Sequence, residues 1–186
     1  MKIVRYLIGA LLVIQAFVVA PVFAQKMATV NVVQIFGTVD PAKVNDYTEY
    51  MAAVNMYEAL TTLDSSGSIK PLLAESWDVS ADTLTYTFKL KSGATFQDGS
   101  PVEAKDVVYS VNRLLALNEG PSYLFEGVLD ENSVSAVGND KVEFKLKKVY
   151  TPFLTNTPIL FVVNSDVAEA NKTSSDPWAQ DFIANN

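Results

Sequence analysis

Residues 83–90 read Thr-Leu-Thr-Tyr-Thr-Phe-Lys-Leu, and this stretch decides the fold class. Every second side chain in it is apolar, and a period of two places alternate residues on opposite faces of a strand. One face therefore packs against a core and the other meets solvent. We expect four side chains to share one interior: Leu84, Tyr86, Phe88 and Leu90.

A helix is predicted downstream, after a tight turn at residues 98–99. Between residues 107 and 115 the apolar side chains recur at the i, i+4, i+7 and i+8 positions of an amphipathic helix. Two starts are open. The helix begins after Ser100 as its cap, or it begins at Glu103 with Asp106 in its first turn.

Two elements are predicted upstream of the strand. Residues 30–36 form an apolar run that is typical of a largely buried strand, and residues 40–41 turn the chain. Residues 49–60 then show apolar side chains at helical spacing. Asp46 and Glu49 stand three residues apart at its start, as a capping pair does.

The remaining pattern adds more strands. Residues 134–137 and 141–146 are two alternating segments around a Gly-Asn-Asp turn, which predicts a hairpin. Residues 159–163 form a further apolar run that predicts a buried strand, and residues 169–186 are polar. Strands and helices are thus interspersed, so the fold class is α/β in a mixed α+β form.

The first residues indicate export. Lys2 and Arg5 precede an apolar run over residues 6–19, which is short for a membrane span, and Ala24 is a small residue suited to signal peptidase. We therefore expect residues 1–24 to be a cleaved signal peptide, with an uncleaved anchor as the alternative. The chain contains no cysteine, so we expect a periplasmic protein without a lipid anchor.

The composition excludes several kinds of function. Cleavage would leave 12 Lys and Arg against 21 Asp and Glu, a net charge of −9, and such a surface repels nucleic acid and anionic membranes. Without His or Cys the chain offers no thiolate nucleophile, no imidazole base and none of the commonest metal ligands. We expect no enzyme activity, no metal and no cofactor, and a secreted hydrolase is disfavoured.

Three stretches together resemble a known family, the extracytoplasmic solute-binding proteins of family 5, which serve oligopeptide, dipeptide and nickel ABC importers. Their order and spacing match that family over nearly all of the expected mature chain. The matching stretches are Asp40-Pro41 with the helix that ends in Tyr57-Glu58-Ala59-Leu60; residues 71–77, 84–90 and 96–102; and residues 104–110 continuing to Arg113-Leu114.

The resemblance implies a type II periplasmic binding protein fold, present here as its N-terminal part. Residues 25–54 would begin lobe one, residues 55–149 would form an inserted subdomain, and residues 150–186 would re-enter lobe one. A second lobe would close over the ligand. By this resemblance we expect a monomer that captures a small solute, such as a short peptide, and delivers it to a membrane permease with its ATPase. The alternative is a stand-alone cell-envelope interaction module without a transport role.

The resemblance also implies ligand-binding residues. In the family the loop after the Asp-Pro turn lines the cleft, which by position is Asn45, Asp46 and Tyr47. Asn45 could bond a ligand amide, Asp46 could pair with an ammonium group, and Tyr47 offers an apolar face with a polar tip. The structural alternative stays open, because Asp46 could only cap the helix and Tyr47 could only pack.

Other candidates are better explained by structure than by binding. Aromatic residues on one face of an alternating strand are far more often core than a ligand platform, and this applies to Trp77, Tyr86 and Phe88. The acidic spacing matches no known calcium loop, so we expect a turn and helix starts at Asp98, Glu103 and Asp106. For Tyr150, Phe153 and Trp178, near the re-entry to lobe one, a place beside the cleft and a packing role are both open.

Overall fold

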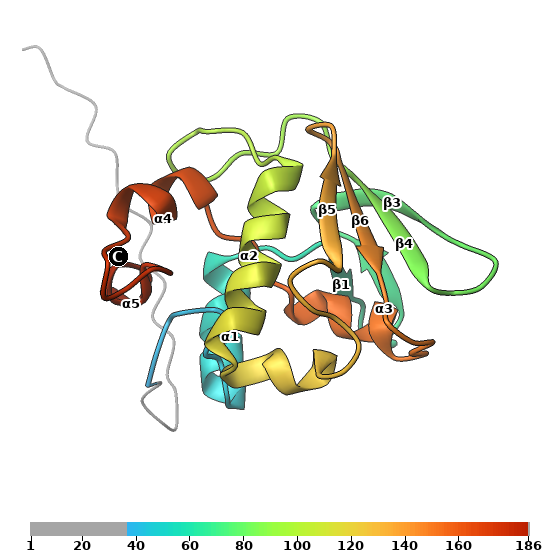
Figure 1. Cartoon of the computed structure of the whole chain (residues 1–186), viewed down its shortest axis with the longest axis horizontal. Helices are drawn as coiled ribbons and strands as arrows, with labels where there is room; N and C mark the ends of the chain where they lie inside the picture. Colours follow the sequence, from blue (N-terminus) through green and yellow to red (C-terminus); the bar gives the residue numbers. More distant parts are fainter. Residues whose placement is uncertain (1–36, 186) are drawn as a thin grey trace, which may run out of the picture. The chain divides into compact units, whose positions relative to one another are not determined.

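The computed structural model describes residues 37–185 (Figure 1), so the predicted signal peptide and the predicted strand at residues 30–36 lie outside the described residues. In chain order the elements are α1 (Tyr47–Met56), β1 (Thr61–Leu63), β2 (Ile69–Pro71), β3 (Ala74–Val79), β4 (Thr85–Leu90), α2 (Ala104–Leu117), the 3-10 helix η1 (Gly120–Phe125), β5 (Val134–Val137), β6 (Lys141–Lys145), α3 (Phe153–Asn156), the 3-10 helix η2 (Thr157–Ile159), α4 (Ser165–Asn171) and α5 (Gln180–Asn185).

A four-stranded antiparallel sheet with the order β3-β4-β6-β5 forms the centre of the fold. Strand β4 lies inside it, where Phe88 pairs with Trp77 on one side and with Val142 on the other. The predicted strand starts two residues too early, because Thr83 has a φ of 56° and belongs to the turn that joins β3 to β4. Strands β1 and β2 form a separate two-stranded antiparallel sheet.

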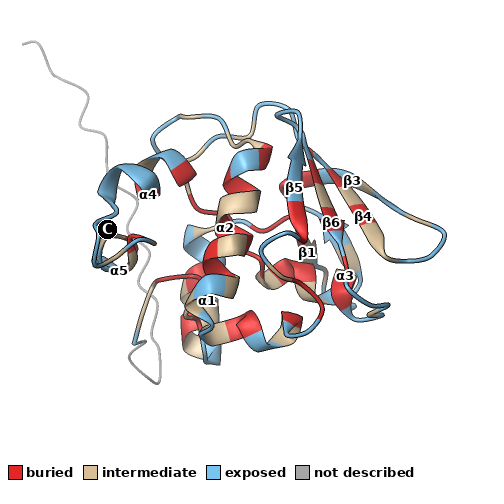
Figure 2. Cartoon of the chain, viewed as in Figure 1, coloured by how far each residue is buried: buried red, intermediate tan, exposed pale blue. Residues whose placement is uncertain are grey.

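The shared interior predicted for the strand is confirmed. Tyr86, Phe88 and Leu90 are buried, and Leu84 is partly buried against the same cluster. Figure 2 shows buried residues on the strands and on the helices beside them. The cluster also takes in Phe153, which comes from the predicted re-entry segment. The boundaries predicted at residues 54/55 and 149/150 stay predictions.

Helix α2 lies against the sheet through β5 and β6 (Figure 1). It takes the second of the two predicted starts, because Glu103 is the N-cap residue and Asp106 Oδ2 accepts the Glu103 backbone N–H at 2.8 Å. The amphipathic pattern is confirmed, since Val107, Val111 and Leu114 are buried. No helix within residues 37–185 combines the length and the apolar character needed to span a membrane.

The hairpin of β5 and β6 is confirmed. The predicted end of the first helix and the predicted strand at residues 159–163 need correction. Helix α1 covers residues 47–56, so it starts after the predicted Asp46 cap but ends before residue 60. Residues 58–60 bond elsewhere, since the Glu58 carbonyl accepts the Val162 N–H at 2.9 Å. The predicted strand at 159–163 is wrong. That segment is largely buried, but it contributes only one isolated bridge, between Ala59 and Phe161.

Candidate functional site

The predicted binding residues lie at the exposed junction between a loop and α1. We call residues 37–46 the Asp-Pro loop. Asn45 and Asp46 at its end are exposed, and Tyr47, the first residue of α1, has 76% of its surface exposed. Asp46 caps α1, since its Oδ1 accepts the Glu49 backbone N–H at 2.9 Å. Its Oδ2 makes no hydrogen bond to any residue from 37 to 185, and because the residue is exposed this oxygen can accept from another partner.

A buried ion pair holds the base of this loop. Arg113 on α2 donates from Nη1 to Asp40 Oδ1 and from Nη2 to Asp40 Oδ2, each at 2.6 Å. Both side chains are almost fully buried, with 1% and 0% exposed. Arg113 Nε also donates to the Trp178 carbonyl at 2.8 Å. The guanidinium therefore ties the Asp-Pro loop to α2 and to the segment before α5.

The Asp40 carboxylate also shapes the turn after it. Its Oδ1 accepts the Ala42 backbone N–H at 3.0 Å, and the Asp40 carbonyl accepts the Lys43 N–H at 3.0 Å. Neither Asp40 nor Arg113 was predicted to have a functional role. Both lie in the stretches that carry the family resemblance, and this was the one signal in the sequence that could have pointed to them.

Tyr57 follows α1, and the charges of this ion pair act on its phenol. Its ring packs against Phe161 with centroids 6.4 Å apart. Burial raises the pKa of the Tyr57 phenol above its ordinary value of 10.0, the Asp40 carboxylate adds to the rise, and the Arg113 guanidinium opposes it.

We expect this raised pKa to be visible in a titration at alkaline pH. Because the folded protein favours the neutral phenol of Tyr57, the stability that it contributes is fully present below pH 10 and is lost as the pH rises through the raised pKa. Ultraviolet titration of tyrosinate should show a late-ionising component that Tyr57→Phe reduces. If Tyr57→Phe leaves the late component unchanged, the phenol does not have this environment.

A separate pocket lies at the other end of α1. It has a volume of about 430 Å³, and its walls include Met56, Phe96, Val163 and Ile183. Since a ten-residue helix is about 15 Å long, the pocket is distant from the Asp-Pro loop at the amino end of α1. The structure therefore does not bring the predicted binding residues into this pocket.

The amide groups at this pocket are already engaged. Gln97 Nε2 donates to the Met56 carbonyl at 2.8 Å. Asn164 Nδ2 donates to Ser100 Oγ at 2.9 Å and to Asp98 Oδ2 at 3.1 Å. A ligand site needs a few polar groups that can turn to the ligand, and these amides have internal partners. We therefore favour the Asp-Pro loop over the pocket as the candidate binding site.

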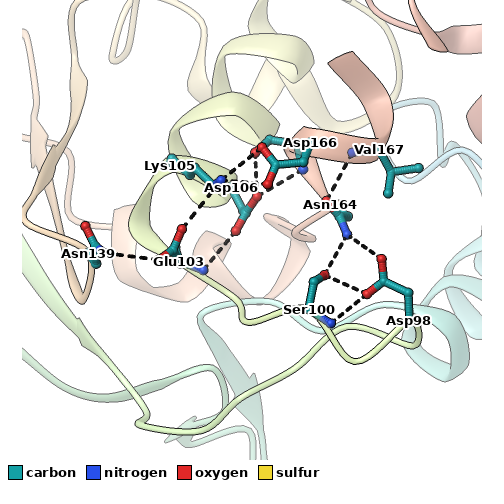
Figure 3. Close-up of polar contacts among 10 residues, drawn as sticks. Asp98, Ser100, Glu103, Lys105, Asp106, Asn139, Asn164, Asp166 and Val167 are labelled. Carbon is teal, nitrogen blue, oxygen red and sulfur yellow. Dashed lines mark hydrogen bonds and ion pairs between the residues drawn. The ribbon is translucent and has the colours of Figure 1, made fainter. Parts of the chain in front are cut away.

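Asp98, Glu103 and Asp106 have the structural roles that the sequence predicted, in a turn and at helix starts (Figure 3). Asp98 Oδ1 accepts the Ser100 N–H at 2.9 Å and its hydroxyl at 2.6 Å. Buried Asp106 accepts the Ser165 N–H at 3.0 Å and its hydroxyl at 2.5 Å, which joins α2 to the start of α4. Among residues 37–185 no group of acidic side chains is arranged to hold a metal ion.

The aromatic candidates also have structural roles. Trp77 is partly buried with its ring 6.1 Å from that of Phe88, which confirms the core interpretation. Phe153 is fully buried, so it is not a cleft neighbour. Trp178 packs on Tyr109 with centroids 5.5 Å apart. Tyr150 is partly buried against the main core.

Comparisons with known proteins agree with the sequence resemblance. Residues 68–185 match the family described as bacterial extracellular solute-binding proteins, family 5 Middle. The glutathione-binding protein GsiB of Pectobacterium atrosepticum is 33% identical over 153 residues, which is 82% of this chain and 29% of GsiB. GsiB of Escherichia coli K12 is 33% identical over 147 residues, 78% of this chain and 28% of its own length.

Solved structures show the same relation. Listeria monocytogenes OppA bound to peptide superposes with a TM-score of 0.66 at 25% identity, over 72% of this chain and 30% of OppA. The Escherichia coli murein tripeptide binding protein MppA gives a TM-score of 0.65 at 28% identity, over 73% of this chain and 30% of MppA. The chain thus spans less than a third of the length of each of these relatives.

Proposed function

The chain belongs to family 5 of the bacterial extracellular solute-binding proteins, and from this we propose that it is part of the solute-binding component of an ABC importer. Family 5 consists of binding proteins rather than enzymes, and no enzyme activity is part of the proposal. The protein would be exported by its signal peptide and would act as a monomer in the periplasm. A membrane permease with its ATPase would receive the solute.

The proposed solute is a short peptide. The printed names of the relatives describe a glutathione-binding protein, a peptide-bound OppA and a murein tripeptide binding protein. Each of these ligands is a small molecule built on peptide bonds. Such ligands offer an ammonium group, amide donors and acceptors, and side chains of modest size to a binding site.

The observation that carries the proposal is the Asp-Pro loop. The buried ion pair of Asp40 with Arg113 anchors it, and Asn45 and Asp46 at its end are exposed. The outward Oδ2 of Asp46 can accept from a ligand ammonium, and the Asn45 amide can donate to or accept from a peptide group. Tyr47, Met51 and Val54 lie at i, i+4 and i+7 on α1 and are 76%, 42% and 40% exposed. Tyr47 begins an apolar stripe beside the polar groups, and the stripe runs along α1 through Met51 to Val54, which lines the pocket at the other end of the helix.

In the proposed mechanism the ligand bridges this surface and a second lobe. A ligand that contacts both lobes binds the closed state better than the open one, and it shifts the equilibrium towards closure by that difference. A dissociation constant near 1 μM corresponds to about −8 kcal/mol.

Isothermal titration of the full-length protein tests the proposal. Glutathione and a pool of di- to hexapeptides serve as ligands, and we expect saturable binding by at least one of them with a dissociation constant of about 1 μM. Tyr47→Ala should weaken that binding roughly tenfold, which corresponds to about 1.4 kcal/mol. The matched control is Tyr123→Ala, because Tyr123 is 68% exposed and lies on η1.

Two results would contradict the proposal. The first is a wild-type protein that binds no member of the pool. The second is a wild-type protein that binds while Tyr47→Ala and Tyr123→Ala both leave the affinity unchanged, because the site would then lie away from the Asp-Pro loop.

A further inference from the structure

Glu49 is a buried carboxylate whose partners are unusual. It lies in the first turn of α1 with 7% of its surface exposed, and Glu is rarely that buried unless it is paired. Within residues 37–185 it makes no ion pair. Its Oε1 accepts the Gly37 backbone N–H at 3.0 Å, and its Oε2 accepts the Asn45 N–H at 2.7 Å.

These two bonds join the ends of the Asp-Pro loop. Gly37 is the first residue of the loop and Asn45 is one of its last, so a single side chain closes the loop into a ring. The sequence predicted Glu49 only as the partner of Asp46 in a helix cap. Asp46 does cap the Glu49 N–H, but the Glu49 side chain turns to the loop instead of returning to Asp46.

A carboxylate suits this position for two reasons. The amino end of a helix carries a partial positive charge that stabilises an anion in the first turn. A carboxylate also has two acceptor oxygens, whereas a glutamine amide has one oxygen and an NH₂ group that cannot accept from a backbone N–H. The two Glu49 oxygens can therefore accept from both ends of the loop at once, which a glutamine amide does not do with an oxygen and a nitrogen in the same places.

The entry of the loop is shaped to fit this carboxylate. A Cβ atom added to Gly37 would lie 3.0 Å from Glu49 Oε1, which is tighter than ordinary side-chain contacts. An alanine at position 37 would therefore require the Glu49 carboxylate to shift by a few tenths of an ångström.

The middle of the loop is held as well. Lys43 pairs with Glu119 at 3.5 Å, and Gly120 lies so close that a Cβ there would come within 2.7 Å of the Lys43 backbone carbon. Asp40 and Arg113 fix the turn between them. A loop held at its start, middle and end does not have to lose conformational freedom when a ligand binds, and such preorganisation increases affinity.

We infer that Glu49 is a positioning residue for ligand binding: its carboxylate bridges Gly37 and Asn45, so that Asn45, Asp46 and Tyr47 meet the ligand in a preformed loop. This inference rests on the proposed function. It assigns Glu49 a role in affinity without any contact between Glu49 and the ligand.

The test compares Glu49→Gln with wild type in the full-length protein. Glutathione and the di- to hexapeptide pool are titrated, and hydrogen exchange is followed at the Asn45 backbone amide. Glu49→Gln loses one of the two bonds at nearly constant shape, so we expect the dissociation constant to rise about five- to tenfold and the Asn45 amide to exchange faster. Gly37→Ala crowds the same oxygen and should raise the dissociation constant in the same direction.

The matched control is Glu126→Gln. Glu126 is exposed and its side chain has no hydrogen bond or ion pair to any described residue, so the same chemical change there should leave both readouts unchanged. Global destabilisation does not explain a changed affinity while the protein stays folded in the assay. A urea denaturation curve of each variant establishes that the variant is folded under the assay conditions.

The outcomes separate the inference from the proposed function. If wild type binds and Glu49→Gln binds equally tightly, the positioning role is wrong and the proposed function stands. If wild type binds no ligand of the pool, the proposed function is wrong and the inference falls with it.

Discussion

Replacing Arg113 with methionine is expected to lower the free energy of unfolding by about 3–5 kcal/mol. The substitution removes the positive charge and leaves the Asp40 carboxylate buried beneath the Asp-Pro loop with 0% of its surface exposed. Asp40 keeps the Ala42 N–H, but it loses both guanidinium bonds at 2.6 Å. A buried charge without a counter-ion is among the most destabilising single changes in a protein.

Equilibrium urea denaturation measures this effect. Asp40→Leu alone should cost a similar amount, whereas the double variant should cost clearly less than the two single losses together, because it leaves neither charge unpaired. Lys105→Met is the control, since Lys105 is an exposed partner in a surface ion pair with Asp166 and such pairs contribute about 0–1 kcal/mol. Losses that simply add in the double variant would show that the two side chains do not act as a pair.

Phe153→Ala is expected to cost about 3–5 kcal/mol, as large-to-small changes of fully buried aromatic residues do. Its ring is 4.6 Å from that of Tyr86 and 5.4 Å from that of Phe144, and it has 0% of its surface exposed. Truncation removes these contacts and leaves a cavity beside the central sheet. Because Phe153 follows β6 in the chain, the loss would also show that the predicted re-entry segment belongs to the core of the sheet.

Tyr123→Ala is the matched control for this truncation. Tyr123 is 68% exposed, so its loss should change the free energy of unfolding by no more than about 0.5 kcal/mol. If Phe153→Ala were as mild as Tyr123→Ala in urea denaturation, the segment after β6 would not be packed in the core.

The parts of the fold that the sequence predicted well depend on local periodicity. The alternation in residues 85–90 and the helical spacing in residues 107–115 each reflect one buried face, and both elements form as expected. The carboxyl end of α1 and the segment at residues 159–163 were predicted wrongly. There, the hydrogen bond between Glu58 and Val162 and the bridge between Ala59 and Phe161 replace the local pattern. Pairing between such distant residues leaves no period in the sequence.

The candidate site, too, could be predicted only in part from the sequence. Asn45, Asp46 and Tyr47 could be proposed from the family resemblance alone, and the cap made by Asp46 from the spacing to Glu49. The groups that hold the loop could not be predicted. Arg113 and Asp40 are 73 residues apart, and a guanidinium on a helix gives no sign of which carboxylate it will meet.

A crystal structure of the full-length protein with a bound peptide from the binding pool tests the central claim most directly. We predict that the ligand contacts Asn45, Asp46 and Tyr47, with the Glu49 bridge to Gly37 and Asn45 intact. A peptide seated instead in the pocket beside Met56 and Val163, with the Asp-Pro loop left in solvent, would contradict the claim.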